Sequence, residues 1–526
     1  MTPRRQWLHL FTSLTAVALT AGTFVALAAT DAAAQKRGGI IRVGMQGEPP
    51  TLDPHWTTAV NTEVIGGHIF EGLFTLDDSN QPIPMLAESH TVSRDGLTYT
   101  FKLRQGVPFH NGKELVADDV VASLGRWGKQ SIYGKDLFSQ VTSLKALDKY
   151  TVELTLKERS PVVLMNLAQP SSFAAIYPKE IAEKFPPATK VTEFIGTGPY
   201  RFVEWKPDQH VRVARFDGYK PRAEKANGYG GAKQAYADEI RWVPVPDVAS
   251  RVAQMETGEL DYADDLSADA YERLLASPTA RPVIGKLYLW IIMVLNKKEG
   301  IMTNQKVRQA MQAALDMESV MKVAAGGRSE FYRLGSSLAP PEVVAWHTNL
   351  PGLPYNIKDK ARAKALLQEA GYKGEPIRVL TSQEYKWMYD TAIVTKQQLE
   401  EIGMNVELIV VDYATLIQRR NNPTTWDALT TGQGPAFDPT MLPSLNCNWP
   451  GWTCDEEIQK VKSEMLREMD PKKRTALWER QTRLYYEKVA GIRYADIFVL
   501  RAAAKSLKGL NERQQFARFY NVWTEK

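Results

Sequence analysis

The sequence predicts an α/β protein of two or more domains, and three observations carry that expectation. Short apolar strands repeatedly lead into loops rich in glycine, proline and aromatic residues. One succession of strand, helix and strand has the order of a parallel crossover unit. A hydrophobic content of 44% over 526 residues suits a folded body larger than one domain.

The first 34 residues have the pattern of a removable export signal. Arg4 and Arg5 precede an uncharged apolar run at 8–29, and three alanines at 32–34 offer a cleavage site. Several threonines and glycines dilute the run, whereas an uncleaved anchor needs about 20 strongly apolar residues. The arginine pair also fits the twin-arginine pattern over five residues, so both export routes stay open. We expect cleavage after residue 34 and a mature chain that is soluble in the periplasm.

Charge and motif content argue against several function classes. The formal net charge is +5, falls to +4 without residues 1–34, and includes no dense basic run. A nucleic-acid partner would require such a run or patch, so none is expected. The seven histidines lack ligand spacing, and the signatures of zinc proteases, serine hydrolases and phosphate loops are absent. We therefore expect no enzyme, metal centre or cofactor. A secreted hydrolase built from dispersed carboxylates and a ligand-free chaperone or scaffold remain the alternatives.

The first strand is expected at 40–45 and leads into a rigid loop. Residues 46–54 contain one glycine and three prolines, which exclude helix and strand. A loop held in shape by prolines at the end of a buried strand is well placed to contact a ligand. Glu48 and Thr51 are the candidate ligand contacts of this loop.

The segment at about 80–190 has alternating strands and tight turns instead of strands that lead into irregular loops, and it predicts a compact α+β insertion. An Asp-Gly turn at 95–96 precedes an alternating strand at 97–103, and a helix is expected to begin at Ala117. A second alternating strand at 150–156 completes the unit. We place this insertion at about 80–190.

The strongest α/β signal lies at 376–411. A strand at 376–381 is followed by a polar and aromatic loop at 382–387 and by a helix from about Tyr389 to Ile402, which Gly403 ends. A second strand follows at 406–411. Because the connection is a single helical crossover, the two strands should be parallel.

A further strand at 426–430 opens into a glycine-rich loop at 431–439. Ligands of open α/β sheets bind beyond the carboxyl ends of the strands, where all three irregular loops would lie. Each loop could instead be an ordinary surface turn, but their shared aromatic content favours a binding cleft. Trp426 and Trp290 have core packing as the alternative to ligand contact. The candidates from this half of the chain are Trp290, Tyr385, Trp387, Trp426, Gln433, Phe437 and Asp438.

The only two cysteines are Cys447 and Cys454, on either side of a Pro-Gly turn at 450–451. In an oxidising compartment this arrangement favours a local disulfide over a metal site, which would need further ligands nearby. The bond would hold one loop in place.

Four motifs resemble the extracellular solute-binding proteins of family 5, the dipeptide, oligopeptide and nickel receptors of ABC importers. They are Asp95–Gly112, Gly196–Tyr200, Val307–Ala310 and Ala370–Tyr372. The resemblance implies a two-lobed type II, cluster C-like binding-protein fold, with the α+β insertion as an extra subdomain of lobe I. Lobe I would comprise 35–283 and 503–526, and lobe II 284–502. The first motif lies in the subdomain and is expected to be structural.

The resemblance also implies how the protein works. A small peptide-like or other organic solute would bind between the lobes of a monomer, and hinge closure would present it to an ABC permease and its ATPase. In the peptide receptors an aspartate three positions before an acidic-Pro pair meets the ligand's amine. Here the pair is Asp438-Pro439 and that position is Pro435. A buried ammonium without a counter-charge is costly, which argues against free-amine peptides unless Asp438 or Glu48 substitutes.

Overall fold

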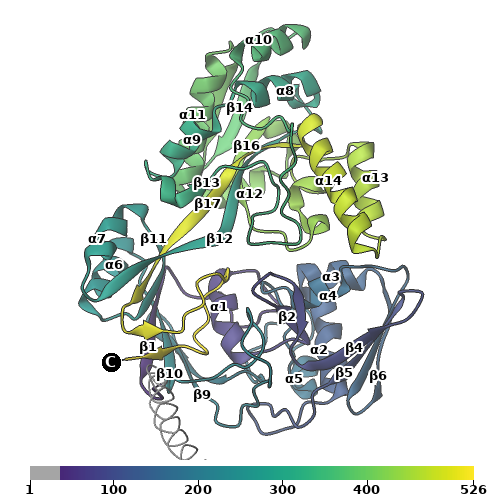
Figure 1. Ribbon diagram of the computed structural model, residues 1–526, viewed down its shortest axis with the longest axis vertical. Helices are drawn as coiled ribbons and strands as arrows, with labels where there is room; N and C mark the ends of the chain where they lie inside the picture. Colours follow the sequence, from purple (N-terminus) through teal and green to yellow (C-terminus); the bar gives the residue numbers. More distant parts are fainter. Residues whose placement is uncertain (1–35, 526) are drawn as a thin grey trace, which may run out of the picture.

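The computed structural model describes residues 36–525, and the expected export signal lies outside this range (Figure 1). Two lobes are stacked along the long axis, and one sheet of eleven strands continues through both. The short strand β13 (Tyr332–Arg333) pairs with β17 beside the main path. Along that path the strands are β15 (Asn405–Val410), β14 (Pro376–Thr381), β16 (Ala428–Gln433), β12 (Ala280–Leu295), β17 (Gly491–Ala504), β11 (Tyr262–Leu266), β1 (Ile40–Met45), β10 (Glu239–Pro244), β9 (His210–Arg215) and β8 (Tyr200–Lys206).

Two long antiparallel strands connect the lobes. β12 and β17 contain 16 and 14 residues and pair with each other from the lower lobe of Figure 1 into the upper one. Their register shifts twice, between Gly285 and Leu289 and between Ile291 and Ile292. Such irregularities bend a strand and raise its local twist. The expected two-lobed fold is confirmed, and the structure shows that two strands link its lobes.

The upper lobe contains the predicted crossover. β14 and β15 are parallel and joined by α11 (Lys386–Glu400), so this prediction is confirmed. The helix begins three residues earlier than predicted, which places Trp387 in its first turn. β16 also extends through Gln433, so residues 431–433 are strand and the predicted loop is shorter. Gly432 suits the strand because a Cβ there would lie 2.8 Å from the side chain of Leu289.

Helices cover both faces of the upper sheet because successive side chains of β12 point to opposite sides. Ile291 and Met293 pack in one core cluster, whereas Trp290 and Ile292 pack in another. The first cluster is covered by α8 (Gln305–Ala314), α9 (Met317–Ala324), α10 (Lys360–Glu369) and α11, and the second by α12 (Tyr413–Arg419), α13 (Glu456–Met465) and α14 (Pro471–Glu487).

The lower lobe carries the predicted α+β insertion. A four-stranded antiparallel sheet packs against a helix that begins at Ala117, as expected. The sheet order is β4 (Ala87–Val92), β5 (Thr98–Leu103), β7 (Thr151–Leu156) and β6 (Val141–Asp148), with α2 (Ala117–Gln130) and α3 (Ile132–Phe138) beside it. The other elements of this lobe are α1 (Val60–Ile69), β2 (Phe74–Leu76), β3 (Pro82–Pro84), α4 (Val163–Ala168), α5 (Lys179–Lys184), α6 (Val248–Thr257), α7 (Tyr271–Ala276), β18 (Leu507–Lys508) and β19 (Trp523–Thr524).

The C-terminal segment returns to the lower lobe and completes its core. Phe519 and Val522 are fully buried in one cluster with Ile41 of β1 and Trp242 of β10. The Phe519 amide donates a hydrogen bond of 2.8 Å to Nε2 of His68, whose ring stacks on the Phe519 ring. The first and last described segments are therefore neighbours. Within residues 36–525 no helix is both long and apolar enough to cross a bilayer.

The fully buried His55 and His68 and the partly buried His110 should make stability depend on pH. Burial lowers the pKa of His55 and His110 to about 4 and the pKa of His68 well below its ordinary value. Unfolded imidazoles protonate near pH 6.5, so unfolding takes up protons below that pH. We expect each ring to reduce the free energy of unfolding by about 2 kcal/mol between pH 6.5 and 5.

The imidazole NMR resonances are the decisive measurement, because burial raises the pKa of Glu63 and that shift acts in the opposite direction over the same range. All three rings should stay neutral in the folded protein at pH 6. A ring of this set that titrates near pH 6.5 in the folded state would contradict the prediction.

Candidate functional site

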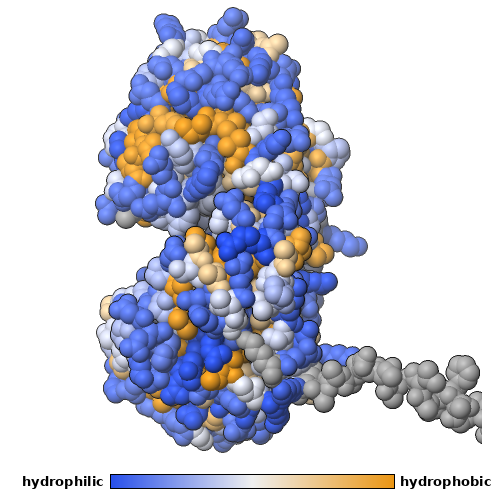
Figure 2. Space-filling model, turned by 90° about the vertical axis from the view of Figure 1, so that its left-hand side faces the viewer, coloured by the Kyte–Doolittle hydropathy of each residue, from blue (hydrophilic) through white to orange (hydrophobic). Residues whose placement is uncertain are grey.

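A cavity of about 540 Å³ lies between the lobes, within the size range of about 300–1,000 Å³ that is typical of small-molecule sites. The surface is visibly indented between the two lobes (Figure 2). Its walls come from the carboxyl ends of β1 and β11, the loop after β1, the start of α1, both linking strands and the C-terminal segment, with Tyr385 and Gly434 from the upper lobe. We call this cavity the interlobe pocket.

The loop after β1 is anchored by a buried carboxylate, Asp53. Its two oxygens accept hydrogen bonds from the Arg126 guanidinium at 2.6 and 3.3 Å. The Tyr177 hydroxyl and the Val191 amide donate to the same carboxylate at 2.9 and 3.0 Å. Burial alone would raise the pKa of Asp53, but the Arg126 charge, these hydrogen bonds and, in the acidic range where Asp53 titrates, the protonated His55 ring hold it below its ordinary value. The loop at the pocket is therefore fixed from behind.

The two predicted contacts of this loop have different positions. Glu48 lines the pocket, and one carboxylate oxygen accepts hydrogen bonds from the Asp208 amide at 2.7 Å and the Trp205 indole at 3.4 Å. Thr51 is buried, and its hydroxyl oxygen accepts a hydrogen bond from the Asp53 amide at 3.1 Å. Thr51 therefore shapes the loop from inside and does not line the pocket.

Tyr385 is the predicted residue of the upper lobe that lines the pocket. It is 39% exposed, and its ring lies 4.8 Å from the ring of Tyr413 and 5.9 Å from that of Trp387. Trp387 is half-buried, and its ring edge lies against Gly432, so it supports the pocket from behind Tyr385.

The remaining predicted contacts are core residues, which corrects their expected placement at the cleft. Trp426 is fully buried, stacks on Trp452 at 5.8 Å and donates its indole hydrogen bond to the Arg420 carbonyl. Both oxygens of Asp438 accept hydrogen bonds from Arg474, at 2.9 and 3.0 Å. The other buried members of this group are Trp290, Gln433 and Phe437.

Trp290 and Gln433 face each other across the ladder between β12 and β16, on the face of the sheet that α14 covers. The Arg493 guanidinium lies 4.9 Å from the Trp290 ring centroid. The amide of Gln433 and the indole nitrogen of Trp290 have no hydrogen-bond partner within residues 36–525. Alternation along the two strands directs both side chains into the lobe, and neither lines the interlobe pocket.

Sequence reasoning missed the pocket's charged residues on β11 and β17. Asp264 accepts a hydrogen bond of 3.0 Å from Nε of the buried Arg501. Asp265 follows it and lines the same pocket. Burial and the neighbouring Asp264 raise the pKa of Asp265 above its ordinary value. A signal existed: β11 is parallel to β1, so its carboxyl end lies at the same edge of the sheet as the first loop.

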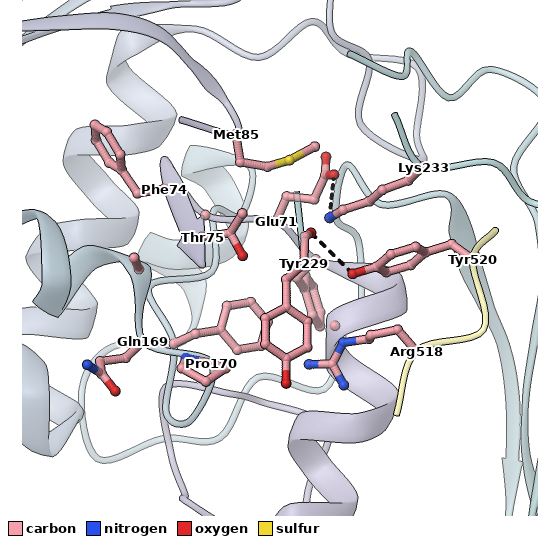
Figure 3. Close-up of a pocket in the computed structure, with 15 residues that line it drawn as sticks. Glu71, Phe74, Thr75, Met85, Gln169, Pro170, Tyr229, Lys233, Arg518 and Tyr520 are labelled. Atoms are coloured by element: carbon pink, nitrogen blue, oxygen red, sulfur yellow. Dashed lines mark hydrogen bonds and ion pairs between the residues drawn. The ribbon is translucent and has the colours of Figure 1, made fainter. Parts of the chain in front are cut away.

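A second cavity lies inside the lower lobe and is too small for an organic solute (Figure 3). It has about 40 Å³ of space, and its wall includes the buried ion pair of Glu71 and Lys233 at 3.0 Å. Tyr520 donates a hydrogen bond to the Tyr229 carbonyl at 3.1 Å across one side. Within the described chain no three His, Cys, Asp or Glu side chains gather as metal ligands. The interlobe pocket is therefore the candidate site.

The predicted disulfide is present between Cys447 and Cys454. The bond closes a short loop, with a sequence separation of 7, so its loss should lower the free energy of unfolding by no more than about 2.5 kcal/mol. Urea denaturation of the C447S/C454S variant measures this loss. Reducing agent should have no further effect on that variant, and a loss near 5 kcal/mol would show that the bond stabilises more than its loop.

Comparisons with known proteins agree on the class of this chain. Residues 81–449 match the family described as bacterial extracellular solute-binding proteins, family 5 Middle. A probable peptide ABC transporter periplasmic-binding protein of Sinorhizobium fredii is 29% identical over 482 residues, which cover 87% of this chain and 89% of the relative. The glutathione-binding protein GsiB of Pectobacterium atrosepticum is 31% identical over 421 residues, 78% of this chain and 74% of the relative.

A solved structure shares the fold over almost the whole length. The periplasmic binding protein DppA of Helicobacter pylori, in complex with the peptide STSA, superposes with a TM-score of 0.76 at 22% identity, covering 93% of this chain and 99% of that one.

Proposed function

This chain belongs to the bacterial extracellular solute-binding proteins of family 5, and from that membership we propose that it is the periplasmic receptor of an ABC importer. It captures a small peptide-like or other organic solute in the interlobe pocket. Closure of the two lobes then presents the solute to a permease and its ATPase in the inner membrane. The protein acts as a monomer after removal of residues 1–34.

One observation carries this proposal: a solute-sized pocket has walls from both lobes. Glu48 and Asp265 come from the lower lobe, and Tyr385 comes from the upper one. A solute that touches both walls binds the closed state more tightly than the open state, which is the condition for ligand-driven closure. We place the division between the lobes within β12 and β17, with 35–283 and 503–526 in lobe I and 284–502 in lobe II.

The acidic side chains of the pocket limit the class of solute that it can bind. Relatives are described as peptide-binding and glutathione-binding, and such ligands carry an ammonium group. Asp438 cannot meet that group in this structure, because Arg474 occupies both of its oxygens. Glu48 and Asp265 line the pocket and form no direct ion pair among the described residues, although the Arg251 and Arg501 charges lie near enough to Asp265 to favour its ionised form.

A thermal-shift screen of the exported protein tests the proposal. The panel contains dipeptides, tripeptides, glutathione, opines, aromatic acids and sugars. A true ligand at one hundred times its dissociation constant should add about 2.7 kcal/mol to the free energy of unfolding, which raises the melting temperature measurably. A panel without any stabilising compound would count against a receptor function.

Small-angle scattering tests closure and oligomeric state together. We expect a monomer whose radius of gyration falls when a stabilising compound from the screen is saturating. An unchanged radius would refute hinge closure. The bound compound should also be recovered chemically unchanged by mass spectrometry after long incubation, whereas a hydrolase would return products.

A further inference from the structure

The interlobe pocket has an excess of negative charge. Three acids and one arginine carry the formal charges of its lining: Glu48, Asp264, Asp265 and Arg501. Arg501 is already engaged, because its guanidinium donates to Asp264 at 3.0 Å and to the Gln515 carbonyl at 2.7 Å. That pair is neutral as a unit. The two other acids leave the pocket with a net charge of about −2 at neutral pH.

Asp265 is the acid best placed to bind a ligand group. No hydrogen bond or ion pair from residues 36–525 reaches its carboxylate, although its side chain is exposed to the pocket. Its main chain is held on both sides: its amide donates to the Asp264 carboxylate at 2.9 Å, and its carbonyl accepts from Arg251 at 2.8 Å. Glu48, in contrast, accepts two hydrogen bonds from its own lobe.

The backbone of Asp265 is strained. Its φ angle is +53°, in the left-handed region that non-glycine residues rarely adopt. Strain of this kind persists only where the surrounding structure imposes it, and it is concentrated at binding and catalytic sites. The two main-chain hydrogen bonds hold the backbone of Asp265 in place at the pocket wall and leave its carboxylate free to meet a ligand.

Two tyrosines stand close to that carboxylate. Tyr288 of β12 and Tyr385 at the start of α11 line the same pocket. Burial raises the pKa of both phenols, and the nearby negative charge of Asp265 raises each further. The three side chains come from the lower lobe, a linking strand and the upper lobe. A carboxylate beside aromatic rings is a favourable environment for an organic cation.

We infer that the interlobe pocket selects solutes with a cationic nitrogen, an ammonium or guanidinium group, which Asp265 binds beside Tyr288 and Tyr385. This inference rests on the proposed receptor function and names its ligand class. Asp265 supplies the negative charge opposite the ligand's cation. Pro435, which stands where the peptide receptors have an aspartate, carries no such charge. Because the carboxylate and Tyr385 belong to different lobes, the same cation draws the lobes together.

Matched ligand pairs that differ only in the cation test this inference by calorimetry on the exported protein. The pairs are arginyl-alanine with citrullinyl-alanine, alanyl-alanine with its N-acetyl form, and putrescine with 1,4-butanediol. In at least one pair the cationic member should bind at least tenfold more tightly to the wild-type protein. Asp265→Asn should weaken that binding at least tenfold and leave the neutral member within about twofold.

Asp217→Asn is the matched control, because it makes the same chemical change at an exposed carboxylate that pairs with Arg215 in the lower lobe. This control should keep the wild-type preference. Asp265→Glu, which retains the charge, should recover part of the affinity lost in Asp265→Asn. Melting temperatures of all variants without ligand separate lost binding from lost folding.

The outcomes distinguish the two proposals. If neutral solutes bind and close the protein while cationic ones do not, or if Asp265→Asn keeps the cation preference, the cationic ligand class is wrong and the receptor function stands. If no pair and no compound of the wider screen stabilises the protein, both proposals fail.

Discussion

Replacing Arg126 with methionine should lower the free energy of unfolding by about 3–5 kcal/mol, measured by urea denaturation. Asp53 and Arg126 are both buried, and the substitution leaves a buried carboxylate without its counter-charge. The guanidinium also donates to the carbonyls of Phe185 and Thr189, which would lose their partner. The change would also loosen the loop that carries Glu48, so we expect weaker binding of any pocket ligand.

Two controls separate these contributions. Lys113 and Glu180 form an ion pair of 2.7 Å in which both side chains are about half exposed, and Lys113→Met should cost less than about 1 kcal/mol. The double variant D53N/R126M should recover part of the loss, because it removes the buried charge but leaves the two carbonyls unpaired. A cost near 1 kcal/mol for Arg126→Met alone would show that the cluster does not anchor the loop.

Gly198→Ala should destabilise the protein by about 3 kcal/mol, at the upper end of the range for overpacking. The Gly198 amide donates to the Ile69 carbonyl at 2.9 Å, and a Cβ at Gly198 would lie 2.3 Å from the His68 carbonyl oxygen. The motif Gly196–Tyr200 therefore holds a loop against the end of α1, and close approach of the backbone explains its glycines.

Gly125 is a matched control of opposite sign for the same measurement. It lies within α2, and a Cβ there would meet no atom within 4 Å. Gly125→Ala should stabilise the protein by about 0.5–1 kcal/mol, because alanine is the better helix former. Equal losses at both positions would contradict the close-contact explanation.

The regular elements were predictable because local patterns determine them. β1 and β14 have the predicted bounds, and the parallel pairing of β14 with β15 follows from the single helical crossover between them. The element boundaries that differ from the predicted ones depend on packing against distant parts of the chain. Gln433 belongs to a strand because β12 pairs with it, and the strand contributing that partner lies over a hundred residues earlier.

The site was less predictable, because sequence identifies a side chain's type but not its partner. Asp438 was expected to line the cleft because it lies in a glycine-rich loop after a strand. Its carboxylate instead pairs with Arg474, which lies 36 positions further along the chain. Trp426 was expected to begin a strand, but it lies just before β16 and is fully buried. Asp265 was overlooked because its proposed role depends on its left-handed backbone and on its lack of an ion pair among the described residues. Neither property can be read from the pair Asp264-Asp265 in the sequence.

The return of the C-terminal segment to the lower lobe has a consequence for the order of assembly. Phe519 and Val522 share a core with Ile41, so the lobe that begins first along the chain is completed last. Domains usually fold in the order in which a chain is made. Here a chain that lacks its final residues cannot complete the core of its first lobe. The N-terminal lobe therefore depends on the last residues to be made for its full stability.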